Sequence, residues 1–81
     1  MRMDKSIDGY QRLAYAVVEQ AVTDYTRALR RLCRHPNDIN AIAAKEECER
    51  FFRKEMEWYV DLDGELVIRA IQNKVGSEMK Q

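Results

Sequence analysis

The sequence predicts an all-α protein, in which an antiparallel helical hairpin is followed by a shorter third helix that completes a three-helix bundle. Charged residues make up 35% of the 81 residues, whereas the chain has only three glycines and one proline, a composition typical of long helices. Apolar residues recur at steps of three and four, which is the spacing of one helical face. The length allows a single domain, residues 1–81.

The first helix is expected to span about residues 9–34. Asp8 is a suitable N-cap, and Gln11, three residues later, is its capping-box partner. Pro36 is expected to end the helix, because the residue before a proline disfavours helical dihedral angles. The apolar face of this helix comprises Tyr10, Leu13, Ala14, Val17, Val18, Ala21, Val22, Tyr25, Ala28, Leu29, Leu32 and Cys33.

A second helix is expected at about residues 39–60, with Asn37 or Asp38 as its N-cap. The short connector before it favours an antiparallel hairpin. The chain then breaks near Asp63, which is expected to cap a third helix over residues 64–75, before Gly76. The apolar face of the third helix is predicted to comprise Leu66, Val67, Ala70, Ile71 and Val75.

The cysteines and acidic residues do not form a recognisable metal site. In the predicted hairpin, Cys33 and Cys48 lie roughly 10 Å or more apart, so we expect no disulfide, which requires Cα atoms within about 7 Å. Together with His35 they do not make the four-ligand set of a structural zinc site. The run 61–65 is acidic, but it lacks the ligand spacing of a calcium loop.

The sequence favours binding over catalysis. It has no recognisable pairing of a nucleophile with a base and no glycine-rich phosphate loop, so we expect neither enzymatic activity nor a cofactor. No apolar run approaches the roughly 20 residues of a membrane span. We therefore expect a cytoplasmic protein without a membrane partner. Fourteen basic and 14 acidic residues balance, which argues against a general binder of duplex DNA.

The polar side of the first helix is arginine-rich. Arginine forms bidentate contacts with phosphate and carboxylate groups, and this helix uses arginine in place of lysine. The side is therefore interpreted either as a solvated surface or as a patch that binds phosphate or an acidic protein surface. The candidate binding residues are Arg12, Arg27, Arg30, Arg31 and Arg34.

The second helix has more aromatic and apolar residues than one core face requires. Either the third helix covers the surplus, or part of it is an interface with another chain, and homo-oligomerisation is the expectation for so small a domain. The candidate interface residues are Phe51, Met56, Trp58 and Tyr59. Glu55 lies among them and is expected either to reach water at the margin or to be a partly buried carboxylate.

The run Glu47–Arg53, followed by Leu62–Glu65 and Ile68, resembles a group of small prophage proteins of Firmicutes. The resemblance covers about residues 10–75. Lys54 stands where those proteins usually have serine, and the later aromatic pair is Trp58-Tyr59, displaced relative to their usual Trp-Phe.

The resemblance implies a phage or mobile-element origin, and small helical proteins from that setting commonly act by binding. The leading expectation is a counter-defence (anti-CRISPR-type) inhibitor of a host nuclease complex such as a CRISPR effector. The alternatives are an oligomeric sponge that sequesters a signalling nucleotide through the arginines and a nucleic-acid-associated phage regulator. The expected partner is therefore a host protein complex, with a nucleotide or nucleic acid as the alternative.

Overall fold

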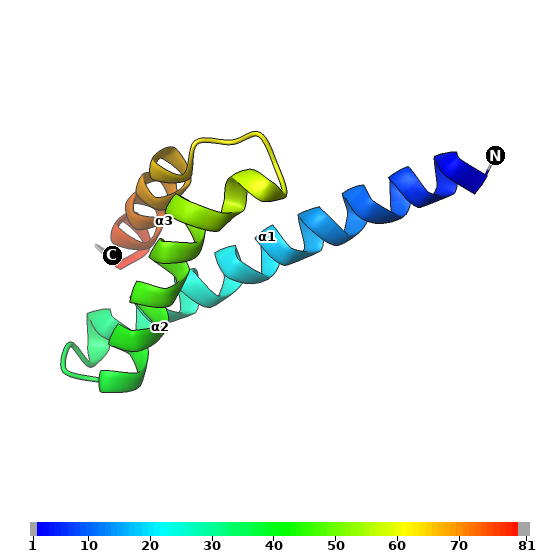
Figure 1. Ribbon diagram of the computed structural model, residues 1–81. Coiled ribbons are helices and arrows are strands. Elements are labelled where there is room, and N and C mark those ends of the chain that lie inside the picture. The colour runs from blue at the N-terminus through cyan, green and yellow to red at the C-terminus, as the bar shows by residue number, and fades with distance from the viewer. Residues whose placement is uncertain (1, 80–81) are drawn as a thin grey trace.

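The computed structural model describes residues 2–79 and contains three α-helices, which we label as in Figure 1. They are α1 (Arg2–Arg34), α2 (Ile39–Arg50) and α3 (Gly64–Met79). The chain continues directly from α2 into a π-helical turn, Phe51–Glu55, and then a 3₁₀ turn, Met56–Trp58. The described residues contain no strand, so the predicted all-α class is confirmed.

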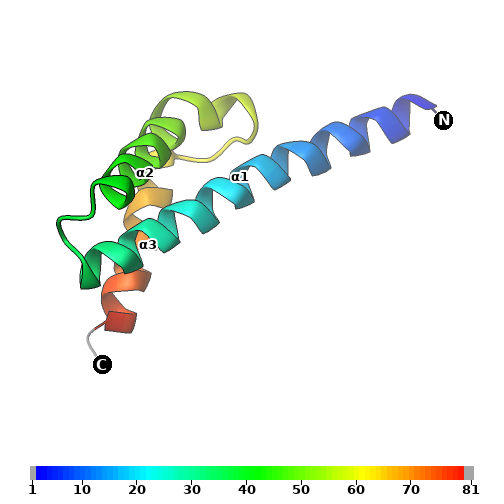
Figure 2. The same cartoon turned by 90° about the horizontal axis from the view of Figure 1, so that it is seen from below.

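The three helices form a bundle at one end of α1. α2 runs back along α1, and α3 packs against α1 and the π-helical turn (Figures 1 and 2). The N-terminal half of α1 projects away from this bundle. The molecule is therefore elongated, with extents of 51 × 25 × 17 Å.

Two aspartates fix the starts of α2 and α3. The Asp38 side chain accepts a hydrogen bond from the backbone N–H of Ala41 at 3.1 Å. The Asp63 side chain accepts one from the backbone N–H of Glu65 at 2.9 Å. These bonds satisfy amides that have no partner inside the helix, as expected of N-caps. Both predicted caps are confirmed, and Asp38 rather than Asn37 is the cap of α2.

Two predicted helix ends are wrong. α1 begins at Arg2, so Asp8 and Gly9 lie inside the helix and Asp8 is not its N-cap. α3 continues through Gly76 to Met79 instead of ending at residue 75. In both places the sequence lacks proline, and a glycine inside a helix costs only about 1 kcal/mol relative to alanine. A capping residue or a glycine permits a helix to end there without forcing it to end.

The predicted α-helix over residues 39–60 is also wrong in its second half. The backbone N–H of Met56 bonds to the carbonyl of Phe51, five residues earlier, so one extra residue is accommodated in this turn. The chain then tightens into the 3₁₀ turn, in which the N–H of Tyr59 bonds to the carbonyl of Met56. The side chains after Glu55 therefore point in directions that differ from those in a regular α-helix.

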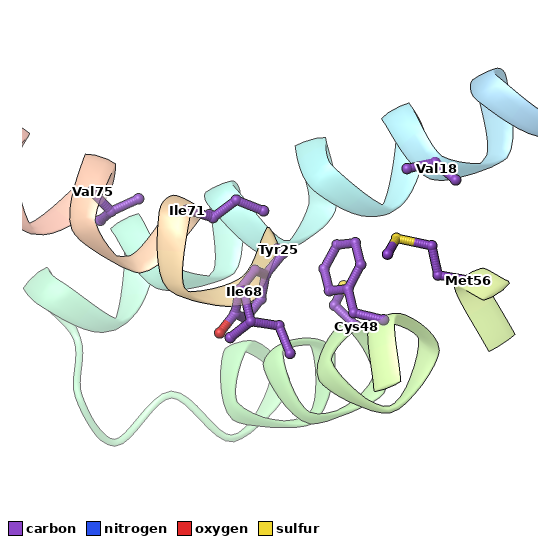
Figure 3. Close-up of a cluster of buried hydrophobic side chains, with 8 residues drawn as sticks. Val18, Tyr25, Cys48, Met56, Ile68, Ile71 and Val75 are labelled. Atoms are coloured by element: carbon purple, nitrogen blue, oxygen red, sulfur yellow. The ribbon is translucent and has the colours of Figure 1, made fainter. Parts of the chain in front are cut away.

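The core lies where the three helices and the π-helical turn meet (Figure 3). Tyr25, Met56 and Phe52 are its most completely buried side chains, with exposed fractions of 0, 1 and 2%. The remaining members of this cluster are Val18, Cys48, Ile68, Ile71 and Val75.

The buried face of α3 differs from the predicted one at three positions. Ile71 and Val75 are buried as expected, but Ile68 is the third buried residue. Leu66 and Ala70 are exposed instead. Because Gly64 lies against the backbone of Phe52 and Glu65 pairs with Arg53, both in the π-helical turn, the rotation of α3 is set by tertiary contacts rather than by its own pattern.

Tyr25 connects all three helices. Its hydroxyl donates a hydrogen bond to Glu49 Oε2 of α2 at 2.7 Å and accepts one from Gln72 Nε2 of α3 at 3.1 Å. Its ring meets the edge of the Phe52 ring, with the centroids 5.7 Å apart. Burial, followed by the hydrogen bond to the Glu49 carboxylate, raises the pKa of Tyr25 well above its usual value, so the phenol stays protonated.

Candidate functional site

Three surfaces are candidates for function, and the first is an arginine cluster at the C-terminal end of α1. Arg30, Arg31, Arg34 and His35 line a depression of about 380 Å³ together with Glu78 of α3. Basic side chains are favourable at this end of a helix, because the unpaired carbonyl groups make it negative. The cluster contains three of the five arginines predicted to bind a ligand.

Two of these three arginines are already neutralised by carboxylates of the same chain. Arg30 forms two hydrogen bonds of 2.9 Å to the two carboxylate oxygens of Glu78. Arg31 contacts Asp38 at 2.5 Å. These arginines hold the pKa values of Glu78 and Asp38 below their usual range. Among the described residues, no carboxylate pairs with Arg34, so it is the cluster's unneutralised guanidinium.

The other two predicted arginines lie elsewhere. Arg12 precedes Arg34 by 22 residues on the same helix, a separation of roughly 33 Å along the axis. Arg27 lines a groove on the α2 side of α1, which Arg31 also lines, whereas Arg30 pairs with α3. The five arginines therefore do not form one binding patch.

The second surface is a groove of about 890 Å³ between α1 and α2, which we call the alanine groove. It runs along the hairpin, and small side chains from both helices make its lining shallow and apolar. Charged side chains stand among them, including Asp24 and Arg27 on α1 and Glu47 on α2. The alanines that line it are Ala16, Ala21, Ala28, Ala41 and Ala44. Sequence reasoning missed this groove, although the alanines at helical spacing on both helices were a signal for it.

Cys48 lies in the alanine groove and is buried, whereas Cys33 is exposed, and both are free thiols. Burial, reinforced by the nearby charge of Asp24, raises the pKa of the Cys48 thiol. A raised pKa leaves less of the thiolate, which is the reactive form, at any pH below it.

We therefore expect a thiol-disulfide reagent at pH 8 to modify Cys33 at least tenfold faster than Cys48. The absorbance of the released thiol, followed over time, measures both rates. Cys33→Ser should remove the fast phase and Cys48→Ser the slow phase. Equal rates for the two thiols in the folded protein would contradict the burial of Cys48.

The third surface comprises the exposed apolar side chains along the 3₁₀ turn, the loop after it and the first turn of α3. We call it the aromatic corner, and its members are Trp58, Tyr59, Leu62 and Leu66. Trp58 is 74% exposed, and Leu62 and Leu66 are 57% and 60% exposed. Tyr59 is partly covered by Phe51, with the ring centroids 5.8 Å apart.

The four predicted interface residues divide between the surface and the core. Trp58 and Tyr59 belong to the aromatic corner, and Phe51 is half-buried between the rings of Phe52 and Tyr59. Met56 is a correction, because it is 1% exposed and packs in the core beside Val18 (Figure 3). Met56 follows the buried Phe52 by four residues, the spacing of one helical face, so its side chain lies in the core with Phe52 and not on the surface with Trp58.

Glu55 is half-buried, which is compatible with both expectations, a residue at the margin and a partly buried carboxylate. Within the part of the chain that the structure describes, no three His, Cys, Asp or Glu side chains gather in a way that could hold a metal ion. None of the described helices combines the length and the hydropathy needed to cross a membrane.

Comparisons of the chain with models of protein families, with curated proteins and with solved structures give no match. The fold and these surfaces define a small all-α, three-helix protein that presents apolar surfaces to its surroundings.

Proposed function

We propose that the protein acts by binding another protein, without catalysis, and that the aromatic corner is the contact surface. The observation that supports this most directly is the exposure of Trp58, at 74%, within a run that also exposes Leu62 and Leu66. Tryptophan and tyrosine are enriched among the residues that contribute most to binding at protein interfaces. Burying such side chains in a partner also removes a large apolar area from water.

The corner is held in place by contacts around it, which favours recognition because little motion is lost on binding. The Phe51 ring packs against the Tyr59 ring, with the centroids 5.8 Å apart. Asp63 caps α3, and Arg53 of the π-helical turn pairs with Glu65 of α3 at 2.5 Å. These contacts fix both ends of the loop that includes Leu62.

We further propose that the partner is a host nuclease complex, such as a CRISPR effector, and that binding inhibits it. The support is the resemblance to prophage proteins, whose matching segment Leu62–Glu65 includes part of the aromatic corner. An inhibitor needs only to occupy a surface, so an 81-residue domain without a catalytic centre is sufficient for this role.

The nucleotide sponge is the second candidate, and Arg34 and His35, which line one depression, are the observation in its favour. It is the weaker candidate, because Arg30 and Arg31 already bind Glu78 and Asp38. A phosphate would have to displace those carboxylates or rely on Arg34. The same neutralisation weakens the proposal of a nucleic-acid-associated regulator.

Trp58→Ala is expected to weaken binding to the target nuclease complex at least 30-fold, because a central interface tryptophan contributes about 2 kcal/mol or more. Inhibition of DNA cleavage by a panel of purified CRISPR effectors, and titration calorimetry with any that is inhibited, measure this effect. Ile39→Ala is the matched control, since Ile39 is 79% exposed on α2, away from the corner.

Two results would contradict the proposal. Full inhibition by Trp58→Ala and by Leu66→Ala would exclude the aromatic corner as the contact surface. Absence of inhibition across the panel, together with a thermal shift on adding a cyclic dinucleotide that Arg34→Ala abolishes, would favour the sponge instead.

A further inference from the structure

The chain exposes more surface than a compact monomer of its size. Its accessible area is 6555 Å², whereas a folded monomer of 9.6 kDa exposes about 5,100 Å². Its radius of gyration is 14.9 Å, against about 12 Å for a compact domain of this length. The excess of roughly 1,500 Å² exceeds the ~800 Å² that each partner hides in a stable interface of standard size.

The N-terminal half of α1 extends beyond α2 and α3 (Figure 2). Leu13 and Tyr15 are 63% and 60% exposed there. An isolated helix of about 15 residues is marginally stable in water and gains most of its stability from packing. At positions 11–16 of this half, every side chain except that of Ala14 is exposed, so this part of the helix lacks the packing that such helices normally have.

The alanine groove continues the exposed face of this projecting half. Ala16 and Val17, at the base of the projection, are also part of the groove lining. One stripe of α1 runs from the projecting half along the groove. Its residues are separated alternately by four and three positions, the spacing found where helices pack side by side. It consists of Leu13, Val17, Gln20, Asp24, Arg27 and Arg31.

The charges on this stripe are complementary to a second copy of the stripe in the antiparallel direction. Asp24 accepts a hydrogen bond from Gln20 at 3.0 Å, and among the described residues neither Asp24 nor Arg27 has an ion-pair partner. If a two-fold axis passes between residues 24 and 27, Asp24 of each copy faces Arg27 of the other. The same register places Gln20 opposite Arg31.

We propose that two copies of this chain associate through the alanine groove, with the α1 helices antiparallel and reciprocal Asp24–Arg27 ion pairs across the two-fold axis. The α1 stripe of each copy lies in the groove of the other, between α1 and α2. The alanines permit the close approach of helix axes that this packing needs. The result is a symmetric dimer whose aromatic corners remain free to bind another protein.

Charge reversal tests both the dimer and its register. Light scattering on a sizing column and sedimentation equilibrium over a wide range of concentrations should give twice the 9.6 kDa of one chain. The symmetric dimer contains the Asp24–Arg27 contact twice, once on each side of the axis. Asp24→Arg and Arg27→Asp each convert both ion pairs into pairs of like charges, so each should raise the dimer dissociation constant at least tenfold. The double variant Asp24→Arg/Arg27→Asp restores both pairs and should bring the dissociation constant back to within a few-fold of the unmodified protein.

Two controls separate this proposal from other effects. Glu19→Arg makes the same change of charge on an exposed position of α1 outside the groove and should leave the mass unchanged. Trp58→Ala should also leave it unchanged, so a failure of the dimer and a failure of partner binding are distinguishable. Circular dichroism of each variant shows whether it is folded.

A chain that is monomeric at all concentrations would overturn the proposal. So would a dimer that resists both single reversals, or whose double variant is no tighter than the single ones. A monomer whose alanine groove is occupied by a different protein, and not by a second copy of this chain, would also overturn it.

Discussion

Replacing Gly64 with alanine is expected to destabilise the bundle by about 3 kcal/mol or more. A Cβ atom at this position would collide with the backbone carbonyl oxygen of Phe52 and lie 2.7 Å from the carbonyl carbon. Both atoms belong to the π-helical turn, which cannot yield as a flexible side chain would. The start of α3 must therefore move away and lose its packing. An 81-residue domain has a total stability of about 4–12 kcal/mol, so the loss is a large fraction of it.

Urea denaturation followed by circular dichroism measures this effect. Gly76→Ala is the matched control, because Gly76 lies in the same helix and a Cβ there meets nothing within 4 Å. It should stabilise the protein by up to about 1 kcal/mol, the difference in helix propensity between the two residues. Equal stability of Gly64→Ala and the unmodified protein would mean that α3 does not pack against the π-helical turn in solution.

Tyr25→Ala is expected to cost about 4 kcal/mol, because it removes a fully buried aromatic ring and leaves a cavity at the centre of the core. Tyr25→Phe keeps the ring and removes only the hydroxyl. It should cost about 1–3 kcal/mol, since the hydroxyl bonds a carboxylate, Glu49, and also Gln72. The same urea titrations measure both losses, and their difference separates packing from hydrogen bonding.

Tyr15→Ala is the control for this series, because Tyr15 lies on the same helix and is 60% exposed. Its effect should stay within about 0.5 kcal/mol, as for most surface substitutions. A Tyr25→Phe variant as stable as the unmodified protein would show that Glu49 and Gln72 find equivalent partners without the hydroxyl.

The fold class and the caps of α2 and α3 could be predicted from the sequence because they depend on local patterns. Apolar residues at helical spacing define α1, and Asp38 and Asp63 precede helices whose free amides need a partner. Pro36 separates α1 from α2 at the predicted place. These signals lie within a few residues of the feature that they determine.

The π-helical turn could not be predicted in this way. Residues 51–55 include no glycine or proline, so nothing local marks a departure from the α-helix. The marker is Gly64, about a dozen residues later, which lets α3 approach the Phe52 carbonyl. The burial of Met56, in contrast, follows from its helical spacing of four residues from the buried Phe52, and the prediction that it is an interface residue is wrong.

The arginines show the same limit. Helical spacing predicted that they share the polar side of α1, but not that Glu78, 48 residues later, binds Arg30. The alanine groove was missed because alanines at helical spacing are typical of core faces as well as of open grooves. Only the position of α3, on the other side of the hairpin, leaves this face uncovered.

The position of Tyr25 has a consequence for how the bundle comes apart. Tyr25 belongs to α1, and its hydroxyl forms hydrogen bonds with both α2 and α3. Detaching any one helix therefore breaks a contact that joins it to another helix. The bundle is therefore expected to unfold cooperatively, as a single unit rather than helix by helix. The exposed positions 11–13, 15 and 16 of α1 lie beyond these contacts, so this part of the helix can open and re-form while the rest of the bundle keeps its native structure.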